Sequence, residues 1–184
     1  MARLKVLDPA LSSGKAKELF TAIESKFGSV PNTFKIMGNS PALLEGSLRL
    51  SAALSTGKLG SKTSELIALA VAESNSCSYC LSAHTYVATN LMKMDTATLE
   101  AARHGRATDP KTDAILKFST ALVTKRGMVD DADLYALRDA GVTEEEAAEI
   151  VGHVAINMLT NYFNNTAMPE IDFPLVMPNP AATV

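Results

Sequence analysis

The chain has 184 residues, a length typical of one domain and sufficient to bury a core without disulfide staples. Hydrophobic residues make up 47% and charged residues 20%, a balance that is typical of globular proteins and excludes a disordered chain. The net charge is -3 and the Lys and Arg residues are scattered, which predicts no nucleic-acid partner, because such a partner needs a clustered basic face. We therefore expect a single domain over residues 1–184.

The apolar stretches are all well under the ~20 residues that a membrane-spanning helix needs, so no membrane partner is predicted. The first residues, MARLKVLDPALSSGK, lack the apolar core of a signal peptide. We therefore expect a cytoplasmic location. In that reducing compartment, two cysteines are more often catalytic or metal-binding than structural.

The apolar residues recur at helical spacing along most of the chain, and no stretch alternates as a strand would. The segment 14–28 ends on a glycine, as do several later segments, which is typical of a helix C-terminus. The tail 169–184 holds four prolines and is expected to be extended. The sequence predicts an all-α fold, with helices at 14–28, within 29–41, at 41–57, 61–74, 98–105, 109–127, 130–141 and 143–165, and a further one at the cysteines.

Two nine-residue segments are similar to each other. LRLSAALST (48–56) and LKFSTALVT (116–124) share five positions, and each is followed later by a helix with Glu before apolar residues, at Glu65 and at Glu149. Chance similarity between amphipathic helices and an internal helical duplication both remain open.

The two cysteines lie three positions apart in ESNSCSYCLSAH, residues 73–84. On a helix, Cys77, Cys80 and His84 share one face, and we expect Ser76 to be the N-cap. A helix N-terminus and a nearby imidazole both stabilise a thiolate. The pattern therefore favours two-cysteine redox chemistry, in which one thiol attacks and its neighbour resolves the product into a disulfide.

Three other interpretations compete. A zinc site would need a fourth ligand beyond Cys77, Cys80 and His84. A thioredoxin-like domain would place the pair in a βαβ setting, and a purely structural pair would be two small buried residues. Glu65 lies twelve residues before Cys77 on the preceding predicted helix, so a helical hairpin would bring it near His84. From the residues alone, a solvated carboxylate at a helix N-terminus is the simpler interpretation of Glu65.

The run ELIALAVAESNSCSYCLSAH resembles the core of the carboxymuconolactone decarboxylase superfamily, in its alkylhydroperoxidase D-like (AhpD-like) branch. The family pattern is a glutamate, eleven residues, then C-x-x-C-x-x-x-H, and Glu65, Cys77, Cys80 and His84 match each fixed position. NMLTNYFNN and the later DFP are similar to the C-terminal part of the peroxidase-related members. The core motif falls within residues 60–92, and the resemblance covers most of the chain beyond residue 15.

The resemblance implies an all-helical protein that assembles as a homotrimer or homohexamer and uses no cofactor. It implies a hydroperoxide reductase in which Cys80 attacks the peroxide and Cys77 resolves, with Glu65 and His84 as the proton relay and a dithiol or thiol protein as reductant. Tyr79 departs from the pattern, since the best-studied branch has histidine there, which puts the second proton route in question. A redox sensor or scaffold is the alternative, and a decarboxylase is weaker, because that branch typically lacks both cysteines.

Four polar residues recur at helical spacing in the last predicted helix: His153, Asn157, Asn161 and Asn164. We favour a polar row satisfied by packed helix ends or by a subunit interface, and the alternative is a lining of the active-site pocket. His104, beside a glycine, is expected to be a favourable charge at a helix C-terminus.

Overall fold

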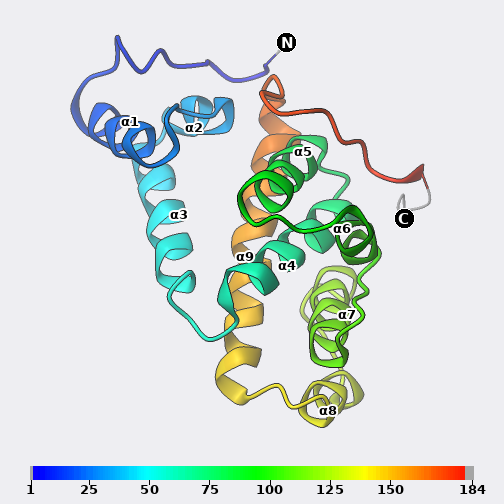
Figure 1. Cartoon of the computed structure of the whole chain (residues 1–184). Helices are drawn as coiled ribbons and strands as arrows, with labels where there is room; N and C mark the ends of the chain where they lie inside the picture. The colour runs from blue at the N-terminus through cyan, green and yellow to red at the C-terminus, as the bar shows by residue number, and fades with distance from the viewer. Residues whose placement is uncertain (1, 181–184) are drawn as a thin grey trace.

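A computed structural model describes residues 2–180, which are all-α (Figure 1). The all-α prediction is therefore confirmed. The described elements are α1 (Gly14–Phe27), α2 (Asn32–Met37), α3 (Pro41–Leu54), α4 (Gly60–Ser74), α5 (Ser78–Tyr86), a π-helical turn η1 (Val87–Leu91), α6 (Thr96–Arg103), α7 (Pro110–Thr124), α8 (Asp131–Asp139) and α9 (Glu144–Ala167). Over the same residues, no helix is both long and apolar enough to cross a membrane.

Most helix ends follow the local signals in the sequence. Gly28 ends α1 with a φ of 80°, a left-handed conformation that glycine adopts without steric cost. Thr143 begins α9 as half of a capping box with Glu146, as its sequence predicts. His104 is the C-cap of α6, so it lies at a helix C-terminus as expected, and its Nε2 is 3.3 Å from Oε1 of Glu100.

The helix α3 ends earlier than its sequence predicts. Its last residue is Leu54, and the chain then turns before Gly57. A Cβ atom at Gly57 would lie 2.6 Å from the carboxylate of Glu149, so this glycine allows a close approach between the turn and α9.

The main core surrounds α4, which is apolar on nearly all sides. Residues 66–72 are all buried, and α4 packs against α5, α6, α7 and α9 (Figure 1). A helix that is hydrophobic all round is typical of the centre of a helical domain. A second, smaller core lies between α1, α2 and α3, with Phe20 and Leu44 at its centre and Phe163 of α9 packed against it.

The proline-rich tail runs beside α5 and α6 without regular secondary structure from 168 to 179 (Figure 1). The Val176 amide donates to the Ser82 hydroxyl at 2.9 Å, and the Asn179 amide donates to the Glu73 carboxylate at 2.6 Å. Arg103 donates to the Met177 carbonyl at 2.8 Å. The extended tail was expected, and it is fixed to the cysteine helix; residues 181–184 of the predicted tail lie outside the described residues.

Candidate functional site

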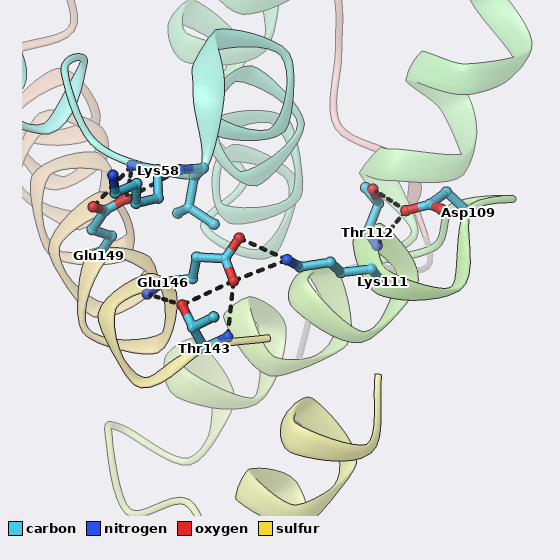
Figure 2. A network of polar contacts seen from close by, with 8 residues as sticks. Lys58, Asp109, Lys111, Thr112, Thr143, Glu146 and Glu149 are labelled. Carbon is cyan, nitrogen blue, oxygen red and sulfur yellow. Dashed lines mark hydrogen bonds and ion pairs between the residues drawn. The ribbon is translucent and has the colours of Figure 1, made fainter. Parts of the chain in front are cut away.

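The start of α4 is held by a carboxylate from α9. Glu149 accepts hydrogen bonds from the backbone amides of Lys58 at 2.8 Å and Leu59 at 3.1 Å (Figure 2). One turn earlier on α9, Glu146 accepts from Lys111 of α7 at 2.7 Å. These contacts join α4, α7 and α9 at one end of the bundle, so the helix that carries Glu65 has a defined position.

The cysteine pair forms a disulfide between Cys77 and Cys80, whose Cα atoms lie 5.3 Å apart. Cys77 is the N-cap of α5, and its sulfur accepts a hydrogen bond from the Cys80 amide at 3.3 Å. Both residues are buried, at 0% and 3% exposure. Two sulfurs at a buried helix N-terminus lie where the helix dipole favours negative charge.

The prediction that Ser76 caps α5 was wrong. Ser76 has a φ of 50°, and it ends α4 instead. Its amide donates to the Glu73 carbonyl, and the next amide, of Cys77, donates to the Ala72 carbonyl, which is the hydrogen-bond pattern of a Schellman C-terminus. The loop between α4 and α5 is too short for a separate cap, so Cys77 takes that position.

Glu65 and His84 lie together, on neighbouring helices. Nδ1 of His84 is 2.8 Å from Oε1 of Glu65, and the two side chains are 27% and 13% exposed. Burial alone would lower the pKa of His84, but the charge of Glu65 and the hydrogen bond outweigh it, so the pKa is raised above its ordinary value. The hairpin geometry expected from the sequence is confirmed, and Glu65 is not a freely solvated carboxylate.

The hydrogen bond to the Cys80 sulfur comes from another helix. Nδ2 of Asn164, on α9, lies 3.3 Å from that sulfur. Oδ1 of the same amide accepts from the Thr33 hydroxyl, on α2, at 2.6 Å. The structure thus pairs Glu65 with His84 and Cys77 with Cys80, and it adds Asn164 and Thr33 to the site.

Tyr79, between the cysteines, is held as a neutral phenol. Its hydroxyl donates to Asp172 of the tail at 2.8 Å and accepts from the Thr33 amide at 3.2 Å. Its ring packs edge-on against Phe173, with ring centroids 5.8 Å apart. Burial, the largest cause, raises the pKa of Tyr79 far above its ordinary value, so this side chain fastens the tail to α5.

Three of the four polar residues on α9 contact groups other than the cysteines. Nε2 of His153 lies 3.3 Å from the Ser64 hydroxyl, and burial lowers its pKa. Asn157 donates to the His153 carbonyl at 2.8 Å, and Asn161 accepts from Asn75 at 3.0 Å. His153 and Asn161 thus contact neighbouring segments, as favoured from the sequence. The bond of Asn157 stays within α9, and the buried Nδ2 of Asn161 has no hydrogen-bond partner among the described residues. Asn164 shares their spacing but contacts the cysteine pair, a role that the spacing alone does not reveal.

In this structure the two cysteines are bonded to each other and not placed as a ligand set with His84. Within residues 2–180, no group of three or more His, Cys, Asp or Glu side chains is placed to hold a metal ion. A buried cysteine pair, on a helix that also carries a histidine hydrogen-bonded to a carboxylate, can carry out disulfide exchange and, once reduced, two-electron oxidation.

Comparison with known proteins agrees with this geometry. Residues 41–107, which include the cysteine motif, match the model of the carboxymuconolactone decarboxylase family. No curated protein sequence matches the chain.

Among solved structures, the AhpD core of an uncharacterized peroxidase-related protein from Ralstonia eutropha JMP134 is similar, with a TM-score of 0.82 and 25% identity over 98% of this chain and 94% of that one. A peroxidase-related protein from Silicibacter sp. TM1040 has a TM-score of 0.76 and 22% identity, over 99% of this chain and 97% of that one. The debrominase Bmp8 in complex with 2,3,4-tribromopyrrole has a TM-score of 0.76 and 22% identity, over 94% of each chain.

Proposed function

We propose that this chain is a two-cysteine, thiol-dependent hydroperoxide reductase of the AhpD-like branch of the carboxymuconolactone decarboxylase superfamily. The family match over residues 41–107 and the similarity to the AhpD core of the Ralstonia protein support this proposal. The observation that carries the proposal is the Cys77–Cys80 pair at the N-terminus of α5, on the helix whose His84 is ion-paired with Glu65. A dithiol that closes reversibly, next to a proton donor and acceptor, has the groups that peroxide reduction needs.

In the first step, the Cys80 thiolate attacks the terminal oxygen of the hydroperoxide. A sulfur–oxygen bond forms and the oxygen–oxygen bond breaks, so the sulfur loses two electrons and becomes a sulfenic acid. The alkoxide that leaves takes a proton and departs as the alcohol. His84, which accepts the thiol proton before the attack, is the proposed source of that proton.

In the second step, the Cys77 thiol attacks the sulfenic acid on Cys80. The disulfide forms, the sulfur–oxygen bond breaks, and water leaves with the thiol proton. A dithiol or a thiol protein then supplies two electrons and two protons through a mixed disulfide, which restores both thiols and oxidises the reductant to its disulfide.

Glu65 is the proposed orienting residue for His84. Its carboxylate holds Nδ1 of the imidazole at 2.8 Å and stabilises the imidazolium that forms when His84 takes the Cys80 proton. General-base assistance of this kind typically contributes ~10²–10⁴-fold to a rate.

We also propose that the protein assembles as a homotrimer or homohexamer. One side of α9 carries exposed apolar residues at helical spacing: Val151 at 48%, Leu159 at 38% and Tyr162 at 58% exposure. An exposed apolar stripe on a long helix is typical of a protein–protein interface. Light scattering at micromolar concentration should give the mass of three or six chains, and a monomer would contradict this proposal.

Turnover tests the proposed function. The reduced protein is mixed with an excess of hydrogen peroxide or an alkyl hydroperoxide and a dithiol such as dihydrolipoamide, and peroxide loss is followed over time. A reductase consumes many equivalents, whereas a redox sensor consumes one per cysteine pair and stops. In a parallel reaction, tribromopyrrole replaces the peroxide as a contrast substrate, because this chain shares its fold with the debrominase Bmp8. Turnover of the contrast substrate without turnover of any peroxide would overturn the proposal.

A further inference from the structure

We propose that Asn164 is a catalytic residue of this site: its side-chain amide donates a hydrogen bond to the Cys80 sulfur and stabilises that sulfur as a thiolate. Thr33 is the positioning residue that holds the amide in this orientation. The inference deepens the proposed function and rests on it for the role of Cys80.

The contact joins two elements that are distant in sequence. Asn164 is 5% exposed and lies on α9, and its Nδ2 reaches the Cys80 sulfur at 3.3 Å. Thr33 is 9% exposed and lies in α2, and its hydroxyl is 2.6 Å from Oδ1 of the amide. The amide is therefore contacted at both ends.

The orientation of this amide follows from its neighbours. If the carbonyl oxygen faced Cys80, its negative partial charge would lie against the lone pairs of the sulfur, and the repulsion would grow when the sulfur became a thiolate. With the N–H toward the sulfur, the carbonyl oxygen accepts the hydrogen bond of the Thr33 hydroxyl. The backbone amide of Thr33 is itself fixed by the Tyr79 hydroxyl at 3.2 Å, so Thr33 has a defined position.

A buried thiolate needs such a donor. Cys80 is 3% exposed, and burial disfavours the charged form of a thiol. Nδ1 of His84 is hydrogen-bonded to Glu65, whereas the side chain that donates to the Cys80 sulfur is Asn164. Hydrogen bonds to a charged acceptor are about twice as strong as those between neutral groups, so this contact strengthens as the thiolate forms.

The same contact serves both halves of the proposed cycle. Before peroxide attack, it raises the fraction of Cys80 that is thiolate. During disulfide reduction, a dithiol thiolate that attacks the Cys77 sulfur expels Cys80, and the amide receives the charge that develops on the leaving sulfur. A thiol with the lower pKa leaves faster, so Asn164 directs the reductant to Cys77.

The test measures the pKa of the Cys80 thiol without any peroxide. A Cys77→Ser parent leaves one thiol and keeps a side-chain acceptor at the N-cap of α5. Its alkylation rate with iodoacetamide is followed from pH 4 to 10. Tyr79 and His84 lie on the same helix as Cys80, Glu65 is bonded to His84, and Asp172 is bonded to Tyr79. None of these titratable groups is changed.

Two substitutions remove the donor or its positioning. Asn164→Asp keeps the shape but places a carboxylate against the sulfur, and Thr33→Val keeps the shape but removes the hydroxyl. We expect each to raise the pKa of Cys80 by about one unit or more, which is about a tenfold loss of thiolate at a pH below the pKa. Thr33→Ser, which restores the hydroxyl, should return the pKa to the parent value.

Asn157→Ala is the matched control. It removes a buried amide from the same face of α9, and that amide contacts the His153 carbonyl and not the cysteines. Circular dichroism checks that each variant is folded. If Asn164→Asp does not fold, the comparison of Thr33→Val with Thr33→Ser tests the role of the Asn164 amide.

If Thr33→Val and the folded Asn164→Asp both match the Asn157→Ala control in thiol pKa, the inference is wrong. The readout is independent of turnover. If the substitutions shift the thiol pKa but the wild-type protein reduces no peroxide, the proposed function is wrong. Asn164 would then still be the hydrogen-bond donor to the Cys80 thiolate.

Discussion

Replacing Glu65 with Gln removes the negative charge beside His84 and keeps the size of the side chain. In the wild-type protein, the pKa of His84 is raised because the charge and hydrogen bond of Glu65 outweigh the effect of burial. Burial is unchanged in Glu65→Gln, and it lowers the pKa of a histidine. We therefore expect the pKa of His84 to move from above 6.5 to below that value.

The size of this change follows from the contact. Two unit charges about 4 Å apart attract by roughly 4 kcal/mol at an effective dielectric constant of about 20. His84 is 27% and Glu65 13% exposed, so solvent screens part of this energy. Shifts caused by one opposite charge are commonly about 1–3 units, and each unit is about 1.4 kcal/mol. We expect the pKa of His84 to fall in Glu65→Gln, because the attraction that raises it is removed while burial is kept.

Proton NMR titration of the imidazole signals measures this shift directly. His153 is the internal control, because Glu65 is not among the groups that shift its pKa and its titration curve should not move. Peroxide turnover near neutral pH should fall at least about tenfold and partly recover as pH rises, because hydroxide can then deprotonate Cys80. An unchanged pKa of His84 in Glu65→Gln would refute the account of the ion pair, and unchanged turnover would refute the relay.

The Glu65–His84 pair also determines how the free energy of unfolding changes with pH. A group whose pKa is raised on folding stabilises the protein fully below its unfolded-state pKa, and this contribution is lost as pH rises through the folded-state value. The difference in free energy of unfolding between the wild type and Glu65→Gln should therefore be larger at pH 6 than at pH 9. A difference that grows with pH would contradict the direction of the shift.

The remaining predictions concern stability. Tyr79→Phe removes the hydroxyl that joins Asp172 to the Thr33 amide, and it should lower the free energy of unfolding by about 1–3 kcal/mol in urea denaturation; no loss would mean that this link does not hold the tail. Glu146→Gln should cost about 1–2 kcal/mol near neutral pH, because the carboxylate accepts from Lys111 and its pKa is lowered chiefly by that contact. A lowered carboxyl pKa gives stability that is present above the unfolded-state value of about 4.5 and is lost as pH falls through the folded-state value. The difference in free energy of unfolding between Glu146→Gln and the wild type should therefore shrink below pH 4.5. A difference that stays constant from about pH 7 to about pH 2 would contradict this prediction.

Local signals in the sequence predict the helices and much of the site. The caps at Gly28 and Thr143 and the spacing of Glu65 from His84 act over a few residues or over one hairpin, so a single sequence carries them. Ser76 was misassigned because serine is common at a helix N-terminus, whereas here the short loop needs a left-handed residue to end α4.

The contacts that complete the site are long-range. Asn164 lies 84 residues from Cys80 and 131 residues from Thr33, and Tyr79 lies 93 residues from Asp172. These residues come together because α2, α9 and the tail pack around α5. The helical spacing within one segment of the sequence cannot reveal such contacts. The spacing of the polar residues on α9 marks a buried face, and it does not distinguish the one that reaches the sulfur.

Which cysteine attacks peroxide is the central claim, and trapping the sulfenic acid tests it most directly. Cys77→Ser and Cys80→Ser are each reduced and mixed with one equivalent of hydrogen peroxide and dimedone, and the modified peptide is identified by mass spectrometry. The account predicts a dimedone adduct on Cys80 in Cys77→Ser, formed much faster than any adduct on Cys77 in Cys80→Ser. A fast adduct on Cys77 with an unreactive Cys80 would reverse the two roles and contradict the account.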